Sequence, residues 1–474
     1  MRGGGYRKVT VTSQPSSGFS REEYDVIVVG GGMAGVCAAL AARREGCSVL
    51  LVERANLLGG CSSLSLVQPW QSFHAPPLKP VDPPRQLISG IAQELVDELV
   101  ARKASPGHLP DPIGFAATLT PVSTDVLPLY LTDKLVREGV EVLLGWALAG
   151  ARCRQDKLLR IRLHAPSIEP SLVREIAGRY FIDASGSAVL LRLAGEEVVV
   201  PARPQAWTHI FTLAPVDSAE ILAYIERHPR DFVLAENWVE RMRKYLAVSG
   251  FFGLVRGARE SAEFPVPRDR LLLFGGSVAE EITVNTTRVF PPKSYFRRST
   301  AERARLAGRL RTEALGQVAA LARWMRTNVP GFKRAEIHRL APEIGVRESF
   351  RLRGRYILKA RDVIGGRSFP DAVALASYPI DVHVSGSAEL KTKQLDARGL
   401  YEIPLRCLQP RRLLNVLAAG RCLSADSAAY ASARVTPIAM ALGQAAGMAA
   451  ATLVRGENAV TESILRAVSD AEWR

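Results

Sequence analysis

A glycine-rich turn between an apolar segment and a helical segment constrains the fold of this chain more than any other feature. Three glycines with G-x-G-x-x-G spacing follow the apolar run 26–29 and open an alanine-rich stretch. This spacing lets backbone N–H groups approach a pyrophosphate, and the start of a helix adds a positive dipole end. We therefore expect a pyrophosphate to bind at this turn, through Gly30, Gly32, Met33, Ala34 and Gly35.

A second apolar run follows the helical stretch and ends in an acid. Residues 49–52 predict a buried strand, and Glu53 stands at its end, 18 residues after Gly35. A carboxylate at this place in a βαβ unit can accept both hydroxyls of an adenosine ribose. The segment therefore predicts a site for an adenine dinucleotide with a free 2′-hydroxyl, and both NAD and FAD meet that description.

Three later segments favour FAD. They are 58–62 (Leu-Gly-Gly-Cys-Ser), 180–187 (a strand ending in Ala-Ser-Gly-Ser) and 415–422 (a strand ending in Gly-Arg-Cys). On these segments the chain resembles the glutathione-reductase-type FAD superfamily, in its fumarate-reductase-like and FAD-dependent oxidoreductase branch, with a relation to heterodisulfide-reductase A-type flavoproteins. The resemblance implies further cofactor contacts at Arg54, Gly59, Gly60, Cys61, Ala184, Ser185, Gly186, Gly420, Arg421, Asp426 and Thr436.

The resemblance extends over residues 24 to 455 and implies the fold. Segments 284–289, 342–349, 377–383 and 403–407 are similar to stretches of the same branch. The expected fold class is α/β, with a discontinuous Rossmann-like FAD/NAD(P)-binding domain and an inserted α+β substrate or cap domain. We expect a disordered tail at 1–22, the FAD-binding domain at 23–199 and 403–474, and the cap domain at 200–402. The active site should lie where the two domains meet.

The apolar periodicity adds detail to this outline. Helices are expected near 87–102, 125–138 and 300–328, the last with a Ser/Thr cap followed by an acid, and a small antiparallel meander at 147–182. Near the C-terminus, Thr436 and Pro437 are read as a capping hydroxyl before a proline at the first helical position. In the flavoproteins that this chain resembles, such a helix points its N-terminus at the flavin. Gly443 and Gly447 should let it pack closely against the dinucleotide-binding strands.

Charge and cysteine spacing limit the partners that we expect. The formal net charge of +15 invites a nucleic-acid function, but the basic residues are scattered and do not alternate with aromatic ones. We expect a generally basic surface and no nucleic acid; an anionic substrate or acidic partner is the lesser alternative. The 6 cysteines contain no C-x-x-C pair, so neither an iron–sulfur cluster nor any other metal site is expected. Cys61 is interpreted as a packed or flavin-proximal residue, and a covalent flavin link stays open.

Catalysis by a flavin dehydrogenase needs a group that exchanges a proton and often a cation that fixes an oxyanion. The sequence offers His383 for the first task and Arg347 and Arg406 for the second. His383 has an ordinary pKa near 6.5 that suits an acid/base, although a structural histidine is an equal alternative. Trp70 and His74 are expected to wall the flavin pocket.

The resulting hypothesis is an FAD-dependent oxidoreductase that transfers a hydride between a small organic substrate and flavin N5. A redox-neutral FAD enzyme that isomerises or eliminates by transient oxidation is one alternative, and a flavin-binding protein that acts on or with nucleic acid is another. No second complete G-x-G-x-x-G unit is present for a separate nicotinamide domain, so the electron partner stays open. We found no apolar run of bilayer length in the sequence, and a cytoplasmic location is expected.

Overall fold

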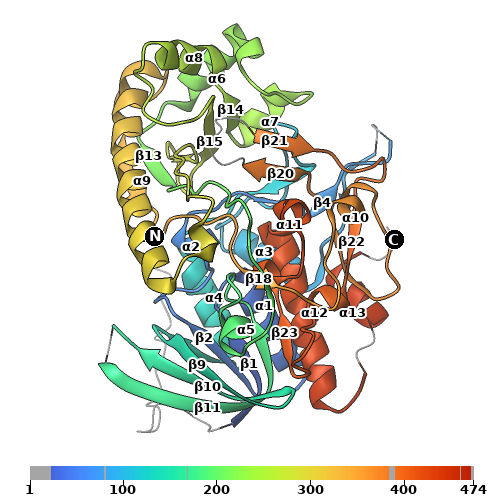
Figure 1. Cartoon of the computed structure of the whole chain (residues 1–474). Helices are drawn as coiled ribbons and strands as arrows, with labels where there is room; N and C mark the ends of the chain where they lie inside the picture. The colour runs from blue at the N-terminus through green and yellow to red at the C-terminus, as the bar shows by residue number, and fades with distance from the viewer. Residues whose placement is uncertain (1–22, 80–81, 168, 384–389, 459–460, 471–474) are drawn as a thin grey trace, which may run out of the picture.

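A parallel sheet organises the first region of the chain in the computed structural model (Figure 1). The structure describes residues 23–79, 82–167, 169–383, 390–458 and 461–470, so the expected tail 1–22 lies outside the described residues. Neighbouring parallel strands run in the order β8-β2-β1-β11-β23. Their bounds are β1 Glu23–Val29, β2 Val49–Glu53, β8 Glu141–Leu144, β11 Glu169–Asp183 and β23 Val416–Ala418. Because β23 comes from the C-terminal part of the chain, the discontinuous α/β fold is confirmed.

The expected meander is also confirmed. The first half of β11 pairs antiparallel with β10 (Lys157–Ala165), which pairs antiparallel with β9 (Ala147–Arg154). The second half of β11 lies between β1 and β23 in the parallel sheet. One long strand therefore carries the chain from the meander into the sheet and ends beside the glycine-rich turn.

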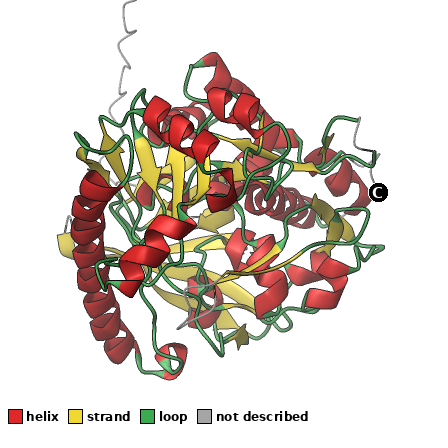
Figure 2. Cartoon of the chain, turned by 90° about the horizontal axis from the view of Figure 1, so that it is seen from above, coloured by secondary structure: helices red, strands yellow, loops and turns green. Residues whose placement is uncertain are grey.

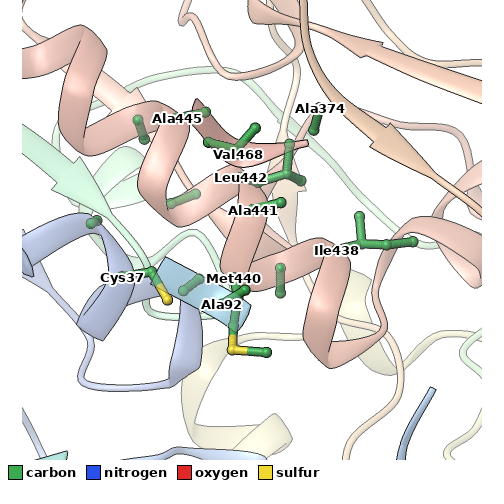
Figure 3. Close-up of a cluster of buried hydrophobic side chains, with 14 of the residues drawn as sticks. Cys37, Ala92, Ala374, Ile438, Met440, Ala441, Leu442, Ala445 and Val468 are labelled. Atoms are coloured by element: carbon green, nitrogen blue, oxygen red, sulfur yellow. The ribbon is translucent and has the colours of Figure 1, made fainter. Parts of the chain in front are cut away.

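Alternate side chains of β1 enter two different cores, as the strand period of two requires. Val26 and Val28 belong to the larger core, and Ile27 and Val29 belong to the core on the other face of the sheet. The larger core is packed by α1 Met33–Arg44, α3 Gly90–Ala101, α4 Val126–Arg137, α12 Thr436–Val454 and α13 Thr461–Val468. Figure 3 shows side chains of α12, such as Met440 and Leu442, among residues of α1, α3 and α13.

Two glycines let α12 lie directly against α1. A Cβ atom on Gly443 would lie 2.1 Å from the carbonyl oxygen of Ala34, and one on Gly447 would lie 2.3 Å from that of Ala38. The close packing expected for this glycine pair is therefore present, but its partner is helix α1 and not the strands. The first half of α1 and the middle of α12 are thereby held side by side.

Helix α12 is long and apolar enough to cross a bilayer by length and composition alone, contrary to the expectation from the sequence. Its most apolar window has a mean hydropathy of 1.5, and 83% of that window is buried inside the protein. The apolarity of α12 is therefore used in packing against α1, α3 and α13.

A second, antiparallel sheet forms the upper part of the molecule in Figure 1. Its strand order is β14-β15-β16-β13-β17, and its core is separate from the other two. The strands are β13 Phe211–Ala214, β14 Ala247–Gly250, β15 Leu271–Gly275, β16 Ile282–Val284 and β17 Glu336–Leu340, with helices α6 Ser218–Arg227, α7 Trp238–Lys244, α8 Phe252–Glu260 and α9 Thr300–Asn328. Viewed from above, helices flank the strands on more than one side (Figure 2).

Helix α9 begins as the sequence predicts. Ser299 is its N-cap and accepts a hydrogen bond from the N–H of Glu302, whose carboxylate accepts one from the N–H of Ser299. This capping box satisfies two backbone donors that a helix start would otherwise leave free.

Short elements connect the two sheets. They are β3 Trp70–Gln71, β4 His74–Ala75, β5 Arg85–Gln86, β6 Leu109–Pro110 and β7 Thr118–Thr120 in the proline-rich segment, then α10 Ala360–Ile364, β18 Arg351–Leu352, β19 Ala372–Ala376, β20 Ile380–His383, β21 Leu390–Lys393 and β22 Tyr401–Pro404. Buried side chains of β19 and β22 belong to the same core as α1 and α12. The domain boundaries at 199/200 and 402/403 stay predictions, since this packing is shared across the second boundary.

Candidate active site

A cavity of about 1000 Å³ lies between the parallel sheet and the antiparallel sheet. Its lining begins at Gly30, Gly32, Met33 and Ala34, where β1 ends and α1 begins. Helix α1 has no side-chain cap at Gly32, so the N–H groups of its first turn receive no side-chain acceptor there. The glycine-rich turn thus presents helix N–H groups beside the cavity, which is the arrangement that binds a pyrophosphate.

Gly35 has a packing function instead. A Cβ atom at this position would lie 1.8 Å from the carbonyl oxygen of Gly30 and 3.3 Å from Cβ of Ala184. Gly35 does not line the cavity. Its lack of a side chain allows α1 to start close to the ends of β1 and β11.

Glu53 lies at the end of β2 and lines the same cavity. Its carboxylate accepts hydrogen bonds from the N–H of Gly31 at 2.7 Å and from the N–H of Ala55 at 2.8 Å. Burial raises the pKa of Glu53 above its ordinary value, and the two N–H groups act in the opposite direction. An ionised carboxylate has about four acceptor positions, so acceptor capacity remains for ribose hydroxyls.

The turn at Gly59 and Gly60 runs beside the first glycine-rich turn. The N–H of Gly59 donates to the carbonyl oxygen of Gly31 at 2.9 Å, and Gly60 has a φ of +54° that favours glycine. Both glycines, Cys61 and Arg54 line the cavity, and Arg54 forms an exposed ion pair with Glu343. The segment 58–62 therefore contributes residues to the same cavity as the first glycine-rich turn.

The end of β11 contributes Ala184, Ser185 and Gly186 to the lining. Ser185 Oγ donates to Asp183 at 2.6 Å, and the fully buried Asp183 also accepts from the N–H groups of Ser185 and Leu191. A side chain on Gly186 would meet the guanidinium of Arg421, which lines the cavity and donates to the carbonyl oxygen of Val346 at 2.7 Å. The Ala-Ser-Gly and Gly-Arg segments are thus in contact.

Three other predicted residues do not line the cavity. Gly420 has a φ of +54° and packs against Ala34. Asp426 is the N-cap of α11 (Ser427–Ala433), where its carboxylate accepts from the N–H groups of Ala428 and Ala429. Arg406 is half-exposed and forms an ion pair of 2.8 Å with Asp371. No contact with a ligand in the cavity is proposed for these three residues.

Thr436 lines the cavity but is not the helix cap that its position before a proline suggested. Helix α12 starts at Thr436 itself, its N-cap is Val435, and no side chain accepts the first N–H groups. Pro437 lies within the first turn, where its missing N–H is tolerated. Val435, Thr436 and Ala439 all line the cavity, so the start of α12 faces it as expected.

An aspartate–histidine pair occupies another part of the lining. His383 Nε2 and Asp381 Oδ2 are 3.1 Å apart on β20, and both side chains are buried. Burial and the charge of Arg347 lower the pKa of His383 to about 3. Burial alone would raise the pKa of Asp381, but His383, Arg434 and Arg347 hold it below its ordinary value. The pair is therefore a neutral imidazole next to a carboxylate.

The hydrogen bond fixes the tautomer of His383. An ionised Asp381 can only accept, so Nε2 carries the proton and Nδ1 has the free lone pair. Among the described residues, Nδ1 has no hydrogen-bond partner. The ordinary histidine pKa near 6.5 assumed from sequence is therefore wrong for this environment; His383 is suited to accept a proton, and not to supply one at neutral pH.

Arginine side chains surround this pair. Arg347 donates through Nη1 to the carbonyl oxygen of Ala206 at 2.8 Å and to Thr208 Oγ1 at 2.6 Å. Arg434 Nη2 lies 3.7 Å from Asp381 Oδ2, and Arg268 also lines the cavity. Sequence reasoning named Arg347 but missed Asp381, Arg434 and Arg268. Asp381 lies in the segment 377–383, which was already noted for its resemblance, whereas no sequence pattern near Arg268 indicated a site.

Trp70 lines the cavity as expected, and its indole N–H donates to Ser62 Oγ at 3.0 Å. His74 does not line it; its Nδ1 lies 2.9 Å from Thr118 Oγ1, and its ring meets that of His108. In the part of the chain that the structure describes, no group of three His, Cys, Asp or Glu side chains is placed to hold a metal ion.

The residues around the cavity fit FAD. Uncapped helix N–H groups stand where a pyrophosphate would lie, and a buried carboxylate with spare acceptor capacity stands where a ribose would lie. The same cavity extends past Arg421 to the start of α12 and to His383, so it provides room beyond the dinucleotide's adenosine half.

The chain belongs to the FAD-dependent oxidoreductase family, whose model matches residues 25–470. It is accordingly a flavoprotein enzyme with a Rossmann-like FAD-binding fold. The more specific relation to glutathione reductase and heterodisulfide-reductase A-type proteins stays a prediction. The match extends over the parallel sheet, the antiparallel sheet and the C-terminal helices.

Individual relatives are distant or short. A 48-residue segment is 48% identical to 4-oxocyclohexanecarboxylate 2-dehydrogenase of Sinomonas cyclohexanicum, which is 10% of this chain and 8% of that protein. Among solved structures, a triple mutant of the flavin-dependent brominase Bmp2 aligns with 94% of this chain and 84% of its own, at 14% identity and a TM-score of 0.47. A geranylgeranyl bacteriochlorophyll reductase-like protein of Thermoplasma acidophilum aligns with 94% and 80%, at 14% identity and a TM-score of 0.45.

Proposed function

We propose that this protein oxidises or reduces a small organic molecule by hydride transfer through FAD, with His383 as the proton-exchanging group. The observation that carries the proposal is that one cavity is lined both by Gly30 and Glu53, which are the residues proposed to hold a dinucleotide, and by the pair Asp381–His383. When bound, FAD supplies a centre at N5 that accepts or gives a hydride. The protein side chains must then hold the substrate and move its proton.

His383 is equipped for proton removal. Its Nε2–H is engaged by Asp381, which orients the ring and stabilises the positive charge that forms when Nδ1 takes a proton. In the oxidative direction, Nδ1 would accept the proton of a substrate O–H, N–H or acidic C–H group while the adjacent carbon loses a hydride. In the reductive direction, the proton would have to come from another group or from solvent, because His383 is neutral at neutral pH.

The start of α12 supports flavin chemistry in the same cavity. Its first N–H groups lack a side-chain acceptor, and its positive dipole end faces the lining through Val435 and Thr436. A helix N-terminus stabilises a nearby negative charge by about 0.3–1 kcal/mol, and by more where it is partly buried. Such a charge develops on a flavin when it is reduced, so α12 would favour reduction.

The test combines a spectrum with one variant. The purified protein should show flavin absorption bands near roughly 370 and 450 nm, as free flavin cofactors do. Under anaerobic conditions, one class of hydride donor should bleach these bands. H383Q should retain FAD and lower the rate of bleaching by about 100-fold or more, in the range that general acid–base catalysis contributes. H228Q is the control, because it replaces an exposed histidine that does not line the cavity. An H383Q protein that is reduced as fast as the wild type would remove His383 from the mechanism.

The electron partner, the direction of the reaction and a cytoplasmic location remain proposals of the same kind. Hydride exchange with a substrate and no net oxidation, as in a redox-neutral enzyme, would appear in the spectroscopic test as substrate conversion without lasting bleaching.

A further inference from the structure

Three arginine side chains from distant parts of the sequence meet in the cavity beside Asp381 and His383. Arg268 precedes β15 in the antiparallel sheet, Arg347 follows β17, and Arg434 lies between α11 and α12. All three line the cavity. Because two of them flank strands of the antiparallel sheet and the third lies between C-terminal helices, the folded chain brings together positive charge from separate parts of the sequence.

Arg268 is the least compensated of the three. Only 4% of its surface is exposed, and its Nε has no hydrogen-bond partner among the described residues. Burial and the nearby charge of Arg288 lower the pKa of Arg268 to about 10. A buried guanidinium is costly unless an acceptor lies against it, so this side chain is placed for an anion that the chain itself does not provide.

The surrounding carboxylates do not balance the cluster. Asp269 forms a two-bond ion pair with Arg270. Asp381 is engaged by His383 and lies 3.7 Å from Arg434, whose own Nε has no partner among the described residues. Among the residues that the structure describes, Asp381 is thus the one carboxylate that lines the cavity near Arg268, Arg347 and Arg434. The described part of the site therefore carries excess positive charge.

We propose that Arg268, Arg347 and Arg434 bind a carboxylate of the substrate, so that the enzyme acts on small organic acids. Guanidinium groups hold a planar carboxylate through paired, charge-assisted hydrogen bonds. The apolar part of the acid would lie against aromatic side chains of the lining, which include Trp70, Phe115 and Tyr378. The inference rests on the proposed function, because it assumes that the reacting carbon lies between the flavin and His383.

The cofactor is the competing explanation for the cluster. The pyrophosphate of a dinucleotide is provided for by the helix N–H groups at Gly32 and Met33. The groups whose charges act on Arg268 are Arg288, Asp269, Arg270 and Asp381, none of which belongs to the glycine-rich turn. The two explanations predict different results for a variant of Arg268. If the arginine cluster binds the cofactor, the variant should lose FAD affinity; if it binds the substrate, FAD affinity should not change.

The experiment measures binding of three probes that share a phenyl ring to the FAD-loaded full chain by calorimetry: benzoate, its planar neutral analogue benzamide, and phenyl phosphate. Benzoate should bind at least about 10-fold more tightly than benzamide, in keeping with the strength of hydrogen bonds to charged groups. R268M should weaken benzoate binding by about 10- to 100-fold and leave benzamide unchanged. R268K should recover part of the loss, because it keeps the charge but not the fork.

The matched control is R309M, which removes an exposed arginine of α9 that does not line the cavity. It should bind benzoate as the wild type does. Equal wild-type binding of benzoate and benzamide, tighter binding of phenyl phosphate than of benzoate, or a loss of FAD from R268M would each overturn the carboxylate assignment. Flavin content, measured separately, tests the proposed function: a chain that never takes up FAD yet prefers benzoate would refute the redox function and leave the anion subsite standing.

Discussion

Glu53 and Gly31 are joined by a hydrogen bond of 2.7 Å from the backbone N–H of Gly31 to Oε2 of Glu53. This bond links the end of β2 to the glycine-rich turn after β1, so the acid that would hold a ribose is fixed relative to the amides that would hold a pyrophosphate. The second oxygen is fixed by the N–H of Ala55. The two halves of the dinucleotide site are therefore one hydrogen-bonded unit.

E53Q should weaken FAD binding by about 10- to 100-fold, since the variant loses a charged acceptor whose hydrogen bonds are worth about 1.5–3 kcal/mol each. The dissociation constant can be measured by quenching of flavin fluorescence during reconstitution. E226Q, on the exposed side of α6, is the control and should bind FAD as the wild type does. Unchanged affinity in E53Q would mean that the ribose lies elsewhere.

Arg406 should be dispensable for the reaction, in contrast to the expectation from the sequence. Its half-exposed side chain pairs with Asp371 at 2.8 Å, away from the cavity lining. R406Q should keep kcat/KM within about twofold and cost no more than about 1 kcal/mol of stability, the range of exposed ion pairs. R347Q provides the contrast, because Arg347 lines the cavity. A large kinetic loss in R406Q would require a conformation in which this side chain reaches the substrate.

Two partly buried histidines predict how stability depends on pH. Burial lowers the pKa of both His74 and His108 to about 4. An unfolded histidine titrates near 6.5, so between these values the unfolded chain binds more protons than the folded chain. Stability should therefore fall as the pH drops from about 6.5 to about 4, by up to about 1.4 kcal/mol per pH unit for each histidine.

Urea unfolding at a series of pH values measures this slope. Below roughly pH 6.5, the unfolded pKa of histidine, the unfolding free energy of H108Q should depend less steeply on pH than that of the wild type. The reason is that the variant takes up one proton fewer on unfolding. H228Q replaces an exposed histidine and should retain the wild-type slope. A wild-type stability that stays level down to pH 4.5 (about the lower end of the window) would show that these rings are protonated in the folded protein.

The sequence predicted those parts of the fold that depend on local patterns. The capping box at Ser299 and Glu302 marked the start of α9, and the apolar runs of β1 and β2 with the intervening glycines marked a parallel pair. Each of these signals lies within a short stretch of sequence, so it can be recognised without knowing which distant residues are in contact. The residues proposed to hold the dinucleotide also come from local patterns, at positions where strands end, and their contacts with FAD stay a prediction.

The part of the cavity around Asp381 and His383 could not be derived in this way. Arg268 and Asp381 are far apart in sequence, and only the folding of the β20–β21 strand pair beside the antiparallel sheet brings them within electrostatic range. Thr436 had the residue type of a cap, but the helix starts one residue earlier than that function requires. The ordinary histidine pKa expected for His383 fails for a related reason: burial and arginines from other segments determine it.

The contact between α1 and α12 gives a final prediction about stability. A methyl group on Gly443 would lie 2.1 Å from the carbonyl oxygen of Ala34 in the first turn of α1, so G443A must push the two helices apart. Such overpacking costs about 1–3 kcal/mol. Because Ala34 also lines the cavity, the displacement should weaken FAD binding as well.

The matched variant is G308A on α9, where a Cβ atom would meet nothing within 4 Å. It should stabilise the protein by about 0.5–1 kcal/mol, the difference between glycine and alanine in a helix. Chemical denaturation of both variants, with flavin content recorded, checks the pair; a G443A protein as stable as G308A would show that the two helices do not pack this closely.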